Sequence, residues 1–119
     1  MIQFTDGPAA MVFLSLRRAP LYLRVVRSAA GEFDALDQLD DEPAADETVF
    51  VYRLAGKPAA AFVDGTRNGR RCGWREVMAT YVVVTQQPDD ATMRDTAKWR
   101  EWCVEQQARD KAGASEAKQ

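Results

Sequence analysis

The chain has 119 residues and a formal net charge of −2, with 46% hydrophobic and 29% charged residues. These values are typical of one globular domain with its own core, and no apolar run approaches the roughly 20 residues of a membrane-spanning helix. We therefore expect a cytoplasmic protein in which neither cysteine, Cys72 or Cys103, needs a disulfide partner.

The first half of the chain predicts strands. Residues 11–16 and 21–27 are rich in apolar and β-branched side chains, and the short proline-containing link at 18–20 suits a hairpin. Residues 33–39 fit either one helical turn or a short edge strand, because their apolar residues fall three apart. The clearest strand is 48–54, where apolar side chains occupy both faces.

The second half predicts a hairpin, a turn and a closing strand. Residues 55–58, Ala-Gly-Lys-Pro, indicate a turn, after which 59–63 returns as a partner strand. Asn68-Gly69 is the favoured pair for a two-residue type I′ turn, which sets Arg67 opposite Arg70. The β-branched run within 78–85 favours a further strand.

A helix is expected after this strand, with Asp89 and Asp90 as candidate N-caps. At helical spacing, one stripe faces the core and Trp102 lies outside it; the stripe comprises Met93, Thr96, Ala97, Trp99, Cys103 and Val104. We predict an α+β fold, an antiparallel sheet of about five to six strands packed by one C-terminal helix. Residues 1–110 form the single domain, and 111–119 form a disordered tail.

The charges are segregated along the chain. Between Ser28 and Tyr52 there are eight acids and no Lys or Arg: Glu32, Asp34, Asp37, Asp40, Asp41, Glu42, Asp46 and Glu47. The next stretch reverses the sign, with six basic residues and the single acid Asp64: Arg53, Lys57, Arg67, Arg70, Arg71 and Arg75. Patches of one sign create local fields that steer and select partners.

Catalytic and metal motifs are missing. The sequence has no histidine, no G-x-S-x-G and no phosphate-binding Gly-Lys-Ser/Thr, and its two cysteines cannot form a structural zinc site alone. The acids lack the spacing of a calcium loop. We therefore expect no cofactor, no metal and no catalytic residues. A small-molecule-binding domain or an enzyme without a recognisable motif is the second alternative.

Two surfaces and one aromatic side chain are candidate binding sites. The acidic residues Glu32 to Glu47 can imitate the phosphates of a nucleic acid toward a basic partner protein, or simply keep a loop in solution. Trp102 is a candidate aromatic anchor at such an interface, or is covered by another part of the chain. The basic tip can bind nucleic acid through Arg67, Arg70, Arg71, Arg75 and Trp74, or can serve only to keep a hairpin in solution.

Segments 33–43, 47–53 and 96–103 together resemble small uncharacterised proteins encoded by bacteriophages and mobile elements. That resemblance implies a protein that binds a host protein, including components of restriction, CRISPR or other defence systems. The leading hypothesis is accordingly a non-enzymatic interaction protein, an inhibitor of a host defence or nucleic-acid-processing protein that acts through its acidic surface. The alternative is a nucleic-acid-binding module that uses the basic hairpin 66–75.

Overall fold

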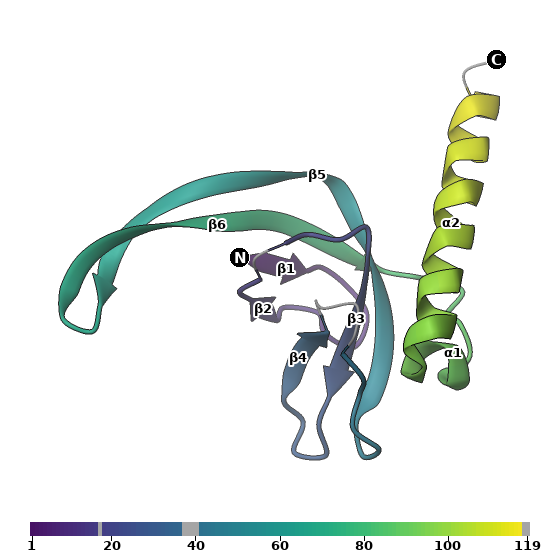
Figure 1. Cartoon of the computed structure of the whole chain (residues 1–119), viewed down its shortest axis with the longest axis horizontal. Coiled ribbons are helices and arrows are strands. Elements are labelled where there is room, and N and C mark those ends of the chain that lie inside the picture. The colour runs from purple at the N-terminus through teal and green to yellow at the C-terminus, as the bar shows by residue number, and fades with distance from the viewer. Residues whose placement is uncertain (17, 37–40, 118–119) are drawn as a thin grey trace.

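The computed structural model describes residues 1–16, 18–36 and 41–117. In this part of the chain, six strands form one sheet in the order β2-β1-β6-β5-β3-β4, and two helices follow. The elements are β1 (Ile2–Phe4), β2 (Phe13–Leu14), β3 (Tyr22–Arg27), β4 (Phe33–Leu36), β5 (Thr48–Arg67), β6 (Arg70–Val83), α1 (Asp90–Arg94) and α2 (Thr96–Ala117). In Figure 1, α2 stands on one side of the curved sheet, and the β5–β6 hairpin reaches out on the other.

The predicted α+β class is confirmed, but the prediction of a wholly antiparallel sheet is wrong. The N-terminal strand β1 runs parallel to β6, with Ile2 opposite Ala79 and Phe4 opposite Tyr81. The other pairings are antiparallel. Since side chains alternate along a strand, Ile2 and Phe4 share a face, and both are fully buried. Burial of these two side chains explains why the chain end pairs with the edge of β6.

The longest strand, β5, replaces the predicted turn at 55–58. It continues from Thr48 to Arg67, and its register with β6 shifts between Ala55 and Ala59. Gly56, at φ +74°, and Pro58 fall within this irregularity. A bulge accommodates both residues, because glycine accepts a positive φ and proline has no N–H to donate to the ladder.

One buried cluster fills the space beneath the N-terminal segment. The Tyr52 hydroxyl accepts a hydrogen bond from the Ala9 amide (2.8 Å) and donates one to the Asp6 carbonyl (2.8 Å). Phe4 packs edge-on against the Tyr52 ring, with centroids 4.8 Å apart. Gly7 has a φ of +69°, and a Cβ there would lie 2.8 Å from the Tyr52 oxygen. The N-terminal loop is therefore fixed closely to the sheet.

The predicted helix is confirmed, although it forms in two pieces. The Asp89 carboxylate accepts from the Thr92 amide (3.0 Å), which confirms Asp89 as an N-cap of α1. Asp95 accepts from the Lys98 amide in the same way (3.0 Å) at the start of α2. The second helix continues to Ala117, into the segment predicted to be a disordered tail. No helix of the described residues is long and apolar enough to cross a membrane.

The face of α2 that packs on the sheet differs from the predicted stripe. Trp99 is buried, and Trp102 is half-buried, stacked on Trp99 at 5.2 Å and edge-on to Tyr22 at 5.0 Å. Val104, predicted to face the core, is 69% exposed. The two indoles are three positions apart on one side of the helix, so the contact with the sheet is centred on them. Periodicity alone had placed Trp102 outside this face.

Candidate functional site

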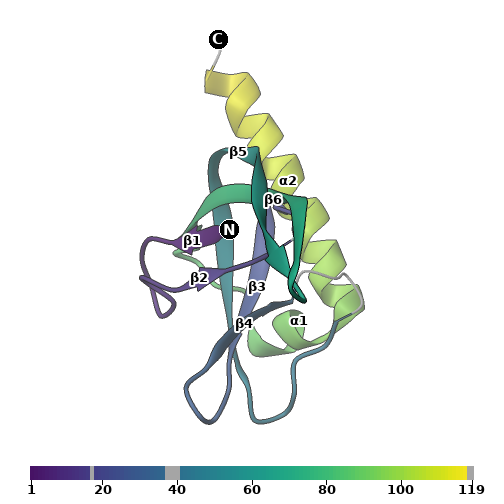
Figure 2. The same cartoon turned by 90° about the vertical axis from the view of Figure 1, so that its left-hand side faces the viewer.

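The outer part of the β5–β6 hairpin, residues 56–78, forms an arm. β3 pairs with β5 only as far as Arg53, and β1 pairs with β6 only from Ala79 onward. Between Ala59 and Met78, each strand of the arm is therefore paired with the other and with no further strand of the described sheet. Figure 1 shows the arm extending away from the sheet, and Figure 2 views the molecule from the arm's side.

The tip of the arm has the predicted geometry. Asn68 and Gly69 both have positive φ, 52° and 74°, as a type I′ turn requires. Arg67 lies opposite Arg70 in the ladder, as predicted, and Thr66 lies opposite Arg71. The sequence therefore specifies how the arginines are arranged around the turn.

The arm is the basic part of the molecule. The side chains of the four arginines are exposed: Arg67, Arg70, Arg71 and Arg75. With Lys57 they make five basic side chains against two acidic ones, Asp64 and Glu76, so the arm has a net charge of +3 while the whole chain has −2. Arg67 ends β5 on one side of the turn, and the other three arginines lie along β6, which makes the arm a positively charged ribbon.

One face of the ribbon carries Trp74, whose ring is in contact with other residues of the arm. The Arg67 guanidinium lies 4.5 Å from the centroid of the Trp74 ring, and the indole N–H donates to the Glu76 carboxylate (3.2 Å). Trp74 also lies across Gly65, where a Cβ would approach the ring to 2.5 Å. These contacts position Trp74 and Arg67 together on the arm.

The opposite face of the ribbon carries Phe62, a residue that the sequence reasoning missed. Its side chain is 74% exposed, and it lies opposite Arg75 in the ladder. The ring lies over Gly73, where a Cβ would come within 2.4 Å of it. The sequence predicts residues 59–63 only as an apolar strand. Gly73 is the signal in the sequence that an aromatic ring can lie across the ribbon at this point, because a glycine leaves room for it.

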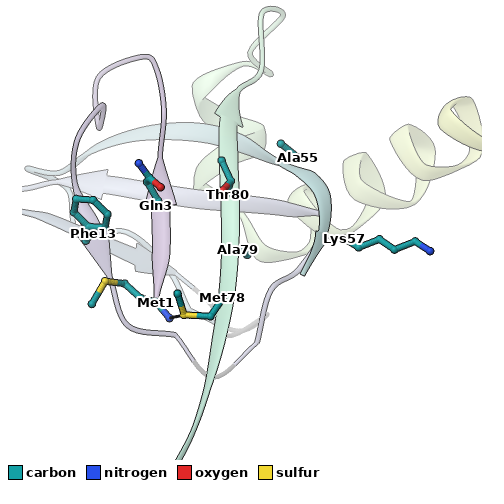
Figure 3. A pocket seen from close by; sticks show the side chains of 8 residues that line it. All are labelled: Met1, Gln3, Phe13, Ala55, Lys57, Met78, Ala79 and Thr80. Atoms are coloured by element: carbon teal, nitrogen blue, oxygen red, sulfur yellow. Dashed lines mark hydrogen bonds between the residues drawn. The ribbon is translucent and has the colours of Figure 1, made fainter. Parts of the chain in front are cut away.

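One hollow, of about 280 Å³, is lined by residues of the arm alone, Asp64, Arg71, Cys72 and Gly73. Two others lie where the arm meets the rest of the described chain. The larger, of about 640 Å³, lies where the arm approaches Ser15 and Leu16, and Arg67, Trp74 and Arg75 line its arm side. The smaller, of about 220 Å³, lies at the base of the arm. Figure 3 shows Met1, Phe13 and Met78 on one side of it and Lys57 pointing away. The larger hollow thus combines positive charge with an aromatic ring.

The acidic residues are placed elsewhere on the molecule. Glu32 and Asp34 lie at the β3–β4 hairpin, far from the tip of the arm in Figure 1. The side chains of these two residues and of Glu42 and Asp46 are exposed, whereas Asp41 and Glu47 are half-buried. Asp37 and Asp40 lie outside the described residues.

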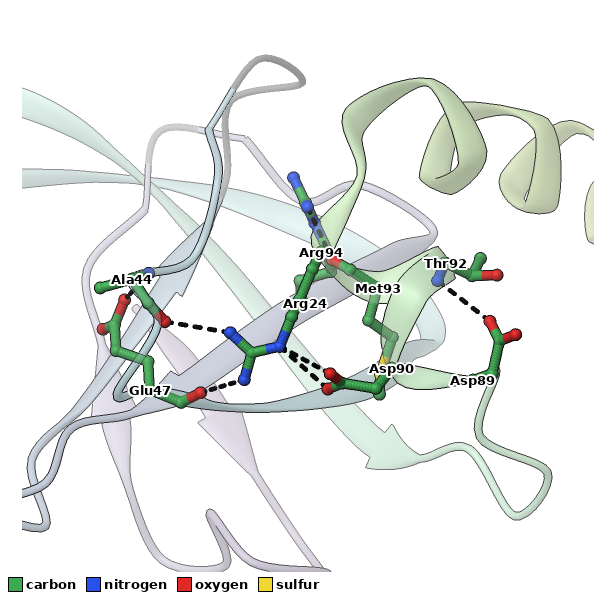
Figure 4. Close-up of polar contacts among 8 residues, drawn as sticks. All are labelled: Arg24, Ala44, Glu47, Asp89, Asp90, Thr92, Met93 and Arg94. Carbon is green, nitrogen blue, oxygen red and sulfur yellow. Dashed lines mark hydrogen bonds and ion pairs between the residues drawn. The ribbon is translucent and has the colours of Figure 1, made fainter.

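Two arginines hold the main chain of the acidic segment 41–47. Arg94 of α1 donates to the carbonyl oxygens of Ala44 (3.0 Å) and Glu47, and it pairs with the Asp90 carboxylate at 2.9 Å (Figure 4). Arg24 of β3 donates to the Asp41 carbonyl (2.7 Å). Because these contacts use backbone carbonyls, they fix the segment without consuming its carboxylates.

Arg24 itself is fully buried between the sheet and the helices. It also donates to the Met93 carbonyl (3.0 Å), and its guanidinium lies 5.1 Å from the centroid of the Trp99 ring. Burial lowers the pKa of Arg24 from its ordinary value. The alternation that reveals β3 as a strand does not reveal this role, since arginine on a strand is ordinarily solvated.

Trp102 and Asp110 of α2 belong to the contact with the sheet. Besides the ring contacts of Trp102, the Tyr22 hydroxyl donates to the Asp110 carboxylate (2.7 Å), which also pairs with Arg53 at 3.3 Å. Burial, then the hydrogen bond to Asp110, raises the pKa of Tyr22 to about 12. Trp102 therefore offers a partner only the part of its ring that Tyr22 and Trp99 leave uncovered.

Within residues 1–16, 18–36 and 41–117, no group of three or more metal-ligating side chains is close enough to hold a metal ion. Cys72, on the arm, and Cys103, on α2, are both free thiols. Burial raises the pKa of Cys103 to about 11. No protein-family model, curated protein or solved structure matches the chain.

Proposed function

We propose that this protein binds nucleic acid through its arm. The observation that carries the proposal is a two-stranded ribbon that extends from the body and exposes four arginines, Arg67, Arg70, Arg71 and Arg75. Guanidinium groups suit phosphates, to which they donate paired hydrogen bonds, and a two-stranded β-ribbon is narrow enough to enter the major groove of a duplex.

The distribution of charge supports this proposal. The arm has a net charge of +3 within a chain of −2, so the remainder of the molecule is negative. A polyanion is attracted to the arm and repelled by the body, which orients the encounter. The aromatic rings of Phe62 and Trp74 lie among the arginines, as in surfaces that contact both phosphates and bases.

Binding of fluorescently labelled DNA and RNA, measured by anisotropy at 50 and 200 mM salt, tests the proposal. Each phosphate contact adds about −0.9 to the slope of log affinity against log salt for duplex DNA, so four arginines give a slope of about −3 to −4. The double variant Arg70→Glu/Arg71→Glu should bind at least about tenfold more weakly and show a slope shallower by about 2.

Arg109→Glu is the matched control. Arg109 is exposed on α2, where it pairs with Glu105 at 3.0 Å, and the substitution makes the same change of charge per residue away from the arm. It should leave the affinity within about threefold of wild type. The proposal is wrong if the wild-type chain binds neither DNA nor RNA at low salt, or if both variants weaken binding equally.

The acidic segment supports a second candidate function, an interaction with a basic partner protein. The specific observation is that Arg24 and Arg94 hold its backbone while Glu42 and Asp46 stay exposed, so these two acidic side chains are presented on a fixed segment. The phage-type inhibitor of a host defence or nucleic-acid-processing protein belongs to this candidate. The double variant Glu42→Lys/Asp46→Lys should then lose a partner that the wild type captures from its natural host, while Arg70→Glu/Arg71→Glu should retain it.

A further inference from the structure

Phe62 is the most exposed aromatic side chain of the described residues, at 74%. One side of its ring lies over the backbone of Gly73, where even a Cβ would approach to 2.4 Å. The glycine gives the ring a flat support and holds it against the ribbon. The other side of the ring faces solvent, since most of the side chain is accessible.

Trp74, on the opposite face of the ribbon, provides an internal comparison. Its ring is covered by Arg67 at 4.5 Å, and its N–H is bound by Glu76. Among the described residues, no guanidinium or aromatic ring stacks on Phe62 in this way. The Phe62 ring is therefore open to a ligand, whereas Arg67 covers the Trp74 ring.

The neighbours of Phe62 are suited to an anion with a flat, apolar part. Arg75 lies directly opposite Phe62, and Arg71 lies on the same face toward the tip, opposite Thr66. Both arginines are exposed, and the one acid on this face of the arm is Asp64, opposite Gly73. A nucleotide presents such a combination, a phosphate for the guanidiniums and a base for the ring.

We propose that Phe62 is a stacking platform for an unpaired base, so that the arm prefers single-stranded nucleic acid to duplex. This inference rests on the proposed function. In a duplex the faces of the bases are covered by their neighbours, and only the phosphates and base edges are available to the arm. In a single strand a base can lie on the exposed side of the ring while Arg71 and Arg75 contact phosphates. Stacking of a base on an aromatic side chain strengthens binding by about 5- to 150-fold.

The experiment compares a labelled oligothymidine with a labelled duplex of the same length, by anisotropy at fixed salt. Phe62→Leu keeps an apolar side chain on the arm but removes the aromatic face, and Phe62→Tyr keeps that face. Phe62→Leu should weaken binding of the single strand at least about fivefold and change duplex binding less than twofold. Phe62→Tyr should restore single-strand binding to within about threefold of wild type. The salt slope of Phe62→Leu should match that of wild type, since the phosphate contacts remain.

Phe13→Leu is the matched control, because Phe13 is a 52% exposed phenylalanine on β2, outside the arm. It should bind both nucleic acids as wild type does. The stacking inference is wrong if Phe62→Leu leaves single-strand affinity unchanged or weakens single-strand and duplex binding equally. In that event Arg70→Glu/Arg71→Glu still reports separately on the proposed function. If the wild type binds no nucleic acid, the proposed function and the stacking inference are both wrong.

Discussion

Removal of the buried Arg24 side chain should destabilise the contact among the sheet, the helices and the acidic segment. The guanidinium donates to the carbonyl oxygens of Met93 and Asp41, at 3.0 and 2.7 Å, and lies 5.1 Å from the centre of the Trp99 ring. It is fully buried. Arg24→Ala removes all three interactions and leaves a cavity where the side chain was.

The expected loss follows from these contacts. Two hydrogen bonds from a charged donor contribute about 1.5–3 kcal/mol each, a desolvated cation–π contact about 2 kcal/mol, and three buried methylenes about 0.8 kcal/mol each. The cost of burying the guanidinium, several kcal/mol, offsets much of that sum. We therefore expect Arg24→Ala to lower the free energy of unfolding by about 3 kcal/mol. Arg24→Met, which refills the space without a charge, should lower it by about 1 kcal/mol.

Urea denaturation followed by tryptophan fluorescence measures these changes, since Trp99 reports directly on the contact. With a slope of about 1–2 kcal/mol per molar urea, a loss of 3 kcal/mol shifts the midpoint by about 2 M. Arg27→Ala is the control on the same strand, since Arg27 is exposed and its guanidinium lies 5.5 Å from the centroid of the Phe50 ring. It should lower the free energy of unfolding by less than about 1 kcal/mol. An Arg24→Ala variant within 0.5 kcal/mol of wild type would refute the reasoning.

Three further outcomes are expected. The pKa of Tyr22 is raised from 10 to about 12, so its contribution to stability is complete below pH 10 and is lost between pH 10 and 12. The urea midpoint of Tyr22→Phe should therefore fall less over that pH range than the midpoint of the wild type. Gly7→Ala should lower the free energy of unfolding by at least about 2 kcal/mol, because the added methyl group clashes with a buried tyrosine hydroxyl and the backbone has a positive φ. Gly31→Ala is the control, since Gly31 has a φ of +86° but open space around it, and it should lower the free energy of unfolding by about 1 kcal/mol in the same thermal or urea titration. Iodoacetamide at pH 8 should alkylate Cys103 much more slowly in the folded chain than in urea, because burial raises its thiol pKa to about 11; equal rates by peptide mass spectrometry would contradict this.

Local patterns predicted several parts of the fold correctly. The Asn68-Gly69 turn, the register that places Arg67 opposite Arg70, and the N-cap at Asp89 all depend on residues close together in the chain. Positive φ at a two-residue turn and a carboxylate near free amides are local preferences, so composition over a few positions is sufficient. The arrangement of the arginines at the hairpin tip is predictable for the same reason, since it depends on the two-residue turn.

Other parts of the candidate site depend on distant residues. The turn predicted at 55–58 fails because β6 supplies a partner for β5 on both sides of the irregularity, so the strand continues through it. From its sequence context, Phe62 is expected to be a core residue. The structure instead places its ring over Gly73 on the two-stranded arm, where it is exposed. Trp102 joins the core because Tyr22, eighty positions earlier in the chain, lies beneath it.

The α+β class, the arginine-lined turn and the separation of acidic from basic residues can be read from the amino-acid sequence, since each depends on residues that are close together in the chain. That the basic hairpin extends from the body as an arm, with the Phe62 ring exposed on it, follows from the three-dimensional packing. The same packing buries Arg24 and brings Arg94 to the backbone of the acidic segment. The exposure of a side chain depends on which surfaces the rest of the chain covers, because burial of apolar area is a property of the whole packed molecule.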